Sequence, residues 1–236
     1  NNAKPPFDDP RVRQAMMLAV DRPSLIAAVS SGYGTAIGSH FSPASPFYED
    51  LTGLFPYDPE RAKVLLAEAG YPDGFEFELT ATQNESWGIP IVEAIIPMLA
   101  KVGIKAIAKP VESSVLSEVI PKGDFQAFMW SNNSGPDALS TLRCFYSKTP
   151  QSACNYTAYN DPEFDKLFEQ ALAERDPAKR TDILRQANDQ LQDGAPVWFF
   201  NYNKAIIAYH PWVHGIQSVA PEMMYQDLSK IWLDAK

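Results

Sequence analysis

The sequence predicts an α/β protein with a sheet whose strands are joined by helical crossovers. Residues 75–82, 104–111 and 124–130 have strand character, and each of the two intervals between them contains a helical pattern. This strand–helix–strand–helix–strand order is typical of a sheet with helices packed against it. A chain of 236 residues fits one large domain or two small ones and is long enough to bury a core.

The chain begins with two helices that carry clear start signals. Asp9 is placed to cap the first helix, whose apolar residues recur at helical spacing and are expected to leave Arg11 and Arg13 outside. Asp21 is placed to cap the second helix. The stretch 32–52 is rich in Gly, Ser and Pro, which predicts a long surface loop.

A third helix leads into the predicted sheet. This helix begins at Asp58 and ends at Gly70. Strand 75–82 then alternates apolar residues with glutamates, as a half-buried strand does. Residues 88–103 and 113–120 are the helical patterns expected to form the two crossovers.

The second half of the chain is helical before it becomes strand-like. Two amphipathic helices are predicted within 161–176 and 176–196, followed by one or two strands within 197–210. The apolar face of the first of these helices is expected to comprise Phe164, Leu167, Phe168, Ala171 and Leu172.

The composition and the charge exclude several classes of function. The net charge of −9 argues against nucleic acid as a partner, because phosphate binding needs a basic surface. No apolar run is long enough to span a bilayer, and the opening "NNAKPPFDDP" lacks the basic start and apolar stretch of a signal peptide. Such an opening fits a mature secreted chain, a cytosolic protein or an excised fragment.

The two cysteines, Cys144 and Cys154, flank a polar segment that contains Pro150 and is interpreted as a loop. A disulfide closing this loop would stabilise the fold by about 2–3 kcal/mol and would imply an oxidising compartment such as a periplasm. The alternative is a pair of reduced, partly buried thiols. Neither CxxC spacing nor a nearby histidine supports a metal site here.

Patterns typical of catalysis or of cofactor binding are missing. The sequence contains no GxSxG, HExxH or Walker motif, and we expect no cofactor and no metal. The histidines are His40, His210 and His214. A proline lies between the last two, which makes them a poor metal site, and they are expected to be loop histidines on a solvated surface. A secreted hydrolase with carboxylates at the strand ends stays open as an alternative, because carboxylates can converge in space from distant positions.

Polar and aromatic residues gather where two of the predicted strands end. In open α/β sheets, ligands bind outside the carboxyl ends of the strands, and amides and indoles suit the recognition of a neutral polar group. The alternative is that these residues form plain turns. The candidate ligand-binding residues are Gln83, Asn84 and Trp87 after one strand, and Trp130, Ser131, Asn132 and Asn133 after another.

Five segments, taken together and in chain order, resemble the family 5 extracellular solute-binding proteins, which are the peptide-, nickel- and oligosaccharide-type receptors of ABC importers. The segments are "PPFDDPRVRQAMMLAVDRPSLI", "YDPERAKVLLAEAGYPDGF", "LAKVGIKAIAKPVE", "YNDPEFDKLFEQAL" and "APVWFFNYNKAIIAY". The similarity runs over nearly the whole chain. It implies a periplasmic protein that binds a solute reversibly, without a chemical step, and that works with an ABC permease.

Members of this family are longer than this chain and have two lobes that close on a ligand. The resemblance implies that the chain is one lobe of a type II-like periplasmic-binding-protein fold, with a mixed sheet flanked by helices. Residues 1–220 would form the ligand-binding lobe. Residues 221–236 would form a C-terminal segment that packs on an N-terminal lobe missing from this chain.

The resemblance also bears on the solute. In the family's dipeptide and oligopeptide receptors, an Asp three residues after the strand-end Trp pairs with the peptide's α-amino group, and in some members an Arg takes the carboxylate. These positions correspond to Asn133 and, by ungapped count, to the neighbourhood of Thr82. Burying an unpaired charge is costly, so a zwitterionic peptide would bind poorly. The implied solute is neutral and rich in hydroxyls or amides, or is a peptide held by its backbone.

Overall fold

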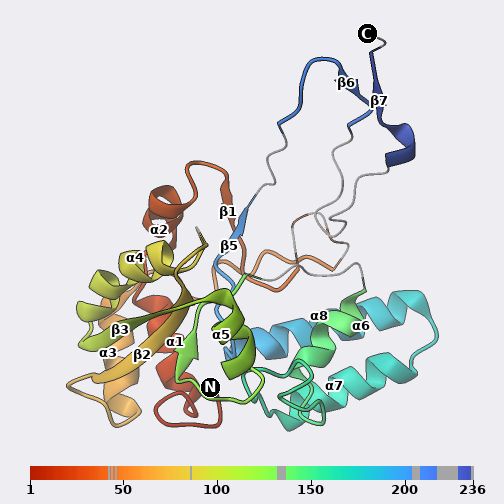
Figure 1. The fold of residues 1–236 in the computed structure, drawn as a ribbon. Coiled ribbons are helices and arrows are strands. Elements are labelled where there is room, and N and C mark those ends of the chain that lie inside the picture. Colours follow the sequence, from red (N-terminus) through yellow and green to blue (C-terminus); the bar gives the residue numbers. More distant parts are fainter. Residues whose placement is uncertain are drawn as a thin grey trace.

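Figure 1 shows three parts of the molecule: a half built around a small sheet, a helical half beside it, and a two-stranded hairpin that projects away from both. The predicted α/β class, a sheet flanked by helices, is confirmed. None of the helices in the described part of the chain is long and apolar enough to cross a membrane. The structure is a computed structural model and describes residues 1–41, 43, 45, 47–85, 87–131, 137–203, 208–216 and 228–234.

The main sheet is parallel, with strand order β3-β2-β4. β2 (Phe75–Thr82) pairs with β3 (Ile104–Val111) along its whole length and, in its carboxyl half, with the short β4 (Ala127–Phe128). Helices α4 (Ile89–Ala100) and α5 (Ser113–Val119) form the predicted crossovers. Only two residues of the predicted strand 124–130 pair as a strand, and Trp130 lies just beyond them.

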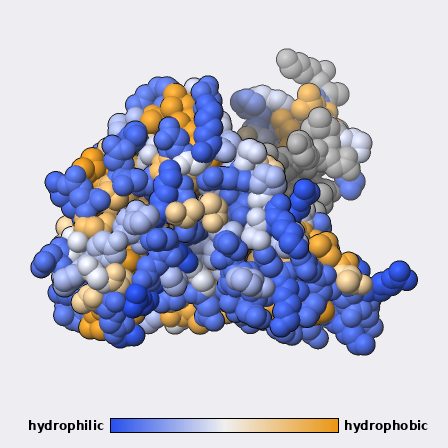
Figure 2. Space-filling view, turned by 90° about the horizontal axis from the view of Figure 1, so that it is seen from below, coloured by the Kyte–Doolittle hydropathy of each residue, from blue (hydrophilic) through white to orange (hydrophobic). Residues whose placement is uncertain are grey.

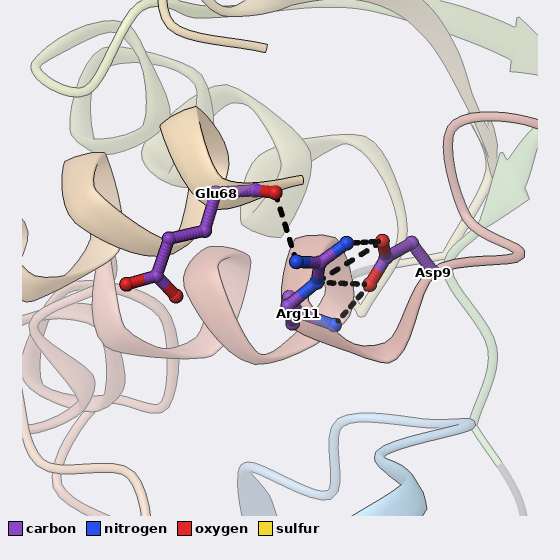
Figure 3. A network of polar contacts seen from close by, with 3 residues as sticks. All are labelled: Asp9, Arg11 and Glu68. Atoms are coloured by element: carbon purple, nitrogen blue, oxygen red, sulfur yellow. Dashed lines mark hydrogen bonds and ion pairs between the residues drawn. The ribbon is translucent and has the colours of Figure 1, made fainter. Parts of the chain in front are cut away.

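Three helices of this half begin where the sequence predicts. The side chains of Asp9, Asp21 and Asp58 accept hydrogen bonds from backbone N–H groups in the first turns of α1 (Pro10–Leu18), α2 (Arg22–Val29) and α3 (Pro59–Glu68). Figure 3 shows how α1 is tied to α3. The guanidinium of Arg11 pairs with the Asp9 carboxylate at 2.6 Å and donates to the carbonyl oxygen of Glu68 at 2.8 Å.

Arg13 was predicted to lie outside, and this prediction is wrong. Its guanidinium is partly buried and donates hydrogen bonds to the carbonyl oxygens of Phe7, Gly194 and Ala195. The last two of these carbonyls belong to the end of α8 (Pro177–Gly194). Arg13 turns inward because the end of a helix offers unpaired carbonyl groups that a cation satisfies.

The prediction of a surface loop over residues 32–52 is wrong in part. Most of the described residues there lie outside helices and strands, but the segment also contains a strand and buried side chains. Gly34–Ala36 forms β1, which pairs antiparallel with β5 (Asn201–Asn203). Ser39 and Phe41 are fully buried, with 0% and 1% of their surface exposed. This segment therefore connects the two halves of the molecule, because Phe41 packs in the hydrophobic cluster of the helical half.

The helical half consists of α6 (Ala138–Leu142), α7 (Pro162–Ala173) and α8, with the 3₁₀-helix η1 (Arg143–Phe145) after α6. Its apolar cluster is separate from the cluster around the main sheet. The predicted face of α7 is buried at Phe164, Phe168 and Ala171, whereas Leu172 is 56% exposed because it lies at the edge of that stripe. Figure 2 shows that hydrophilic residues cover most of the face seen from below.

The disulfide and the chain end complete the fold. Cys144 and Cys154 form a disulfide, which confirms the predicted pairing. The projecting hairpin pairs β6 (Val213–His214) antiparallel with β7 (Trp232–Leu233), and the 3₁₀-helix η2 (Leu228–Lys230) precedes β7. Among the described residues, antiparallel pairing is confined to this hairpin and the β1–β5 ribbon.

Candidate functional site

The carboxyl ends of β2 and β4 lie at one edge of the parallel sheet, because Thr80 pairs with Phe128. Two of the candidate residues meet there. The indole rings of Trp87 and Trp130 lie edge to face, with ring centroids 6.2 Å apart and an interplanar angle of 70°. The ring of Phe128 supports Trp130 from the strand, at a centroid distance of 6.5 Å. The two predicted groups of residues thus approach each other through their tryptophans.

Gln83 and Asn84 take part in a polar cluster at the end of β2. The side-chain amide of Gln83 donates to the carboxylate of Glu112. The side-chain oxygen of Asn84 accepts hydrogen bonds from the hydroxyls of Thr82 at 2.6 Å and of Ser113 at 3.1 Å. These contacts fix the turn after β2 against the start of α5, so both residues have a structural role at the sheet edge.

A cavity of about 410 Å³ opens beside the tryptophan pair. Trp87, Trp130 and Ser131 line it, and Trp130 is 40% exposed, so this end of the cavity reaches the surface. The cavity lies between the two hydrophobic clusters, since residues of both contribute to its walls. The sequence analysis did not predict most of the lining residues, which include Met16, Met17, Val20, Ile91, Ile95, Leu99, Trp198, Phe199 and Phe200.

His40 also lines the cavity. Its ring lies 6.0 Å from the ring of Phe145 and 5.2 Å from that of Phe199. Burial lowers the pKa of His40 to about 4, because an apolar setting disfavours the charged imidazole. His40 is therefore neutral at neutral pH and can accept or donate a hydrogen bond at Nδ1, which has no partner among the described residues.

Trp198 forms another part of the wall. The guanidinium of Arg22 lies over its ring, 5.6 Å from the centroid, and Nε1 of Trp198 is buried without a partner in the described part of the chain. Arg22 also donates to the carbonyl oxygen of Ile37 at 3.0 Å, and burial lowers its pKa. The stretch "VWFFN" that contains Trp198 was interpreted only as a strand, although its three consecutive aromatic residues are a usable signal for a binding wall.

Two candidate residues, Asn132 and Asn133, lie outside the described residues.

The other two histidines, His210 and His214, belong to the projecting hairpin. His214 stacks on Trp232, and Nε2 of His214 lies 3.0 Å from Oδ1 of Asp234. No group of three or more His, Cys, Asp or Glu side chains that could hold a metal ion is found within the described ranges.

Solved structures identify the class to which this lobe belongs. HbpA2 from Haemophilus parasuis matches all of this chain and 47% of its own, with a TM-score of 0.85 and 27% sequence identity. A dipeptide-binding protein from a Pseudoalteromonas species, solved in complex with Met-Leu, matches 99% of this chain and 47% of its own, with a TM-score of 0.84 and 26% identity. The fold is that of a lobe of a solute-binding protein.

The sequence places the chain within this class. Residues 1–153 match the family described as bacterial extracellular solute-binding proteins, family 5, middle, and the chain belongs to that family, as its resemblance predicted. The glutathione-binding protein GsiB of Shigella dysenteriae is 32% identical over 204 residues, which cover 83% of this chain and 40% of GsiB. Haem-binding protein A of Haemophilus influenzae is 32% identical over 209 residues, with 83% and 37% covered. The chain spans less than half the length of these relatives.

Proposed function

We propose that this chain is the solute-binding lobe of a periplasmic receptor that delivers a neutral polar or peptide-like solute to an ABC permease. The single observation that carries the proposal is the Trp87–Trp130 pair, which lines a cavity at the carboxyl edge of the sheet in a family 5 chain. The names of its relatives, a glutathione-binding and a dipeptide-binding protein, support a peptide-like solute.

The site acts by reversible binding and not by catalysis. None of the described residues that line the cavity is Asp or Glu, which leaves a carboxylate-dependent hydrolase without its catalytic groups there. Trp87, Trp130 and Ser131 form the wall that faces the solute. Asn132 and Asn133, the next two residues of the sequence, stay candidate ligand-binding residues. Gln83 and Asn84 hold the outer rim of the site.

Residues 1–220 act as the lobe and residues 221–236 as a segment that packs on a first lobe. Support for this division comes from the projecting hairpin, on which Trp232 and Leu233 are 56% and 62% exposed. Large apolar side chains gathered on a projecting element are typical of a surface that another body covers. Closure of the two lobes on the solute would then exclude water from the tryptophan pair.

The test compares a dipeptide with free termini and the same dipeptide with acetylated and amidated termini, each titrated calorimetrically into the complete receptor. We expect the blocked form to bind at least about tenfold more tightly, because Asn133 is neutral and cannot offset the charge of an ammonium group as a carboxylate would. Asn133→Asp should reverse this preference, and Trp130→Ala should weaken both ligands. Tighter binding of the free dipeptide by the unaltered receptor, or release of cleavage products, would overturn the proposal.

A further inference from the structure

The cavity extends far beyond the rim at which Trp87 and Trp130 meet. It continues from Trp130, which is 40% exposed, to Leu99, which is fully buried. Its volume of about 410 Å³ falls within the range of about 300–1,000 Å³ that is typical of small-molecule sites. The rim and the interior belong to one continuous space.

Apolar side chains make up most of the interior. Met16, Met17 and Val20 come from α1 and the residues after it, and Ile91 and Ile95 come from α4. Protein interiors are close-packed, and an unfilled space with such walls lowers stability. Methionine side chains also adapt to apolar groups of different shapes. A space of this kind that reaches the surface is suited to an apolar group of a ligand.

The lining also offers polar atoms that could satisfy one hydrogen-bonding group. Nδ1 of His40 and Nε1 of Trp198 are buried, and neither has a partner among the described residues. Buried polar groups are normally hydrogen-bonded, so an occupant with an acceptor atom would complete the wall. Arg13, the charged lining residue, already donates to the carbonyls of Phe7 and Gly194. The wall therefore favours a neutral occupant over an anionic one.

We propose that the cavity is a specificity pocket that takes one apolar side chain of the bound solute, aromatic or branched aliphatic, with Trp87 and Trp130 at its mouth. This inference rests on the proposed function and deepens it, because it names the part of the solute that determines selectivity. The backbone of a neutral peptide-like solute lies along the strand ends, and one side chain enters the space lined by α1 and α4.

The first experiment tests the pocket on the 236-residue chain without a transported solute. The chain is labelled at its methionine methyl groups and titrated with p-cresol, a small aromatic probe with one hydroxyl, while NMR spectra are recorded. The methyl signals of Met16, Met17 and Met129, which line the cavity, should shift in a saturable manner. The signal of Met98, which packs against the sheet cluster and does not line the cavity, should stay unchanged.

Two matched substitutions locate the binding. Val20→Phe fills the cavity from a buried position and should weaken p-cresol at least about tenfold, since the added ring occupies its space. Val64→Phe makes the same change at a position on α3 that is 45% exposed, and should leave the affinity unaltered. If Val20→Phe fails to fold, the methyl shifts of the unaltered chain decide whether p-cresol binds in the cavity. Shifts at Met98 alone, equal effects of the two variants or no binding would overturn the proposal.

The second experiment uses the complete receptor and the acetyl amino-acid amides of Gly, Ala, Leu and Phe. Affinity should rise along this series, with the Phe amide at least about tenfold tighter than the Ala amide. Affinities that do not depend on the side chain would overturn the pocket and leave the proposed function in place. If p-cresol shifts the three methyl groups and no amide binds, the pocket stands and the proposed neutral peptide-like solute fails.

Discussion

His40 illustrates how the position of a residue changes its chemistry. Its ring meets three phenylalanine rings edge-on, at centroid distances of 6.4, 6.0 and 5.2 Å for Phe41, Phe145 and Phe199. Nδ1 of the imidazole is buried, and burial among these rings favours the neutral form. Because burial changes the pKa of His40, this residue makes the stability of the fold depend on pH, and that dependence can be measured.

The first prediction concerns pH. The unfolded chain takes up a proton on His40 near pH 6.5, whereas burial lowers the pKa in the folded chain to about 4. Between these values the unfolded state binds more protons, so stability is lost as pH falls from 6.5 towards 4. Between pH 7.5 and pH 5, the unaltered chain should lose about 2 kcal/mol more stability than His40→Gln. Urea unfolding at both pH values measures this, and parallel losses would contradict it.

At the scale of an element, the carboxyl end of α8 is held by side chains of another helix. Helix ends leave carbonyl groups without partners, and those of α8 are met by side chains from α1. Arg13 donates to Gly194 at 2.5 Å and to Ala195 at 3.1 Å, and Gln14 donates to Asp193 at 2.9 Å. Through these bonds the first helix of the α/β half holds the last helix of the helical half.

The second prediction separates the two donors of this helix junction. Arg13→Ala should lower the free energy of unfolding by about 2–3 kcal/mol, because it leaves several partly buried carbonyls unpaired and removes a cation from the helix end. Gln14→Ala is the matched control. Its single hydrogen bond is exposed, and its loss should cost less than about 1 kcal/mol. Urea unfolding compares the variants, and equal losses would show that Arg13 has no special role.

The third prediction concerns the segment between Cys144 and Cys154. The disulfide joins residues ten positions apart, and a double Cys→Ser variant should be about 2–3 kcal/mol less stable, chiefly because the unfolded chain regains freedom. Urea unfolding with and without a reductant measures the effect. The reductant should destabilise the unaltered chain to the same extent and leave the double variant unchanged. A reductant effect on the double variant would point to another cause.

At the scale of the whole molecule, the projecting hairpin differs from the rest of the chain. The two lobe halves bury most of their large apolar side chains in separate clusters, although single ones such as Leu172 are exposed. On the hairpin, in contrast, Trp212 and Trp232 are 49% and 56% exposed, and each stacks on a histidine ring. The proposed first lobe is the body that would cover this surface.

The fourth prediction tests that division. Trp232→Ser should change the free energy of unfolding of this chain by less than about 0.5 kcal/mol, because its indole is mostly in solvent. In the complete receptor the same change should cost more than about 1 kcal/mol if the first lobe buries the indole. Val64→Ser on α3 is the control and should be near neutral in both proteins. A small effect of Trp232→Ser in the complete receptor would argue against packing of this segment on the first lobe.

The sequence predicts those features that depend on neighbours along the chain. Asp9 and Asp58 are local start signals, and the helices begin where those residues indicate. The burial of Phe41 was missed, because it depends on a cluster that includes residues more than a hundred positions away, such as Leu191. The candidate site likewise has a part that the sequence predicts and a part that it does not. The strand-end tryptophans have a local signature, whereas the cavity behind them is assembled from distant segments that contain Val20, Ile95 and Phe199.

Both sulfur atoms of the disulfide belong to residues that border the cavity. After selective reduction, a thiol-reactive fluorophore can therefore be attached beside the pocket without any change to the gene. Displacement of water by an entering molecule would alter the emission of such a dye. A dye attached to one of these cysteines would therefore report the binding of a ligand in the cavity by fluorescence.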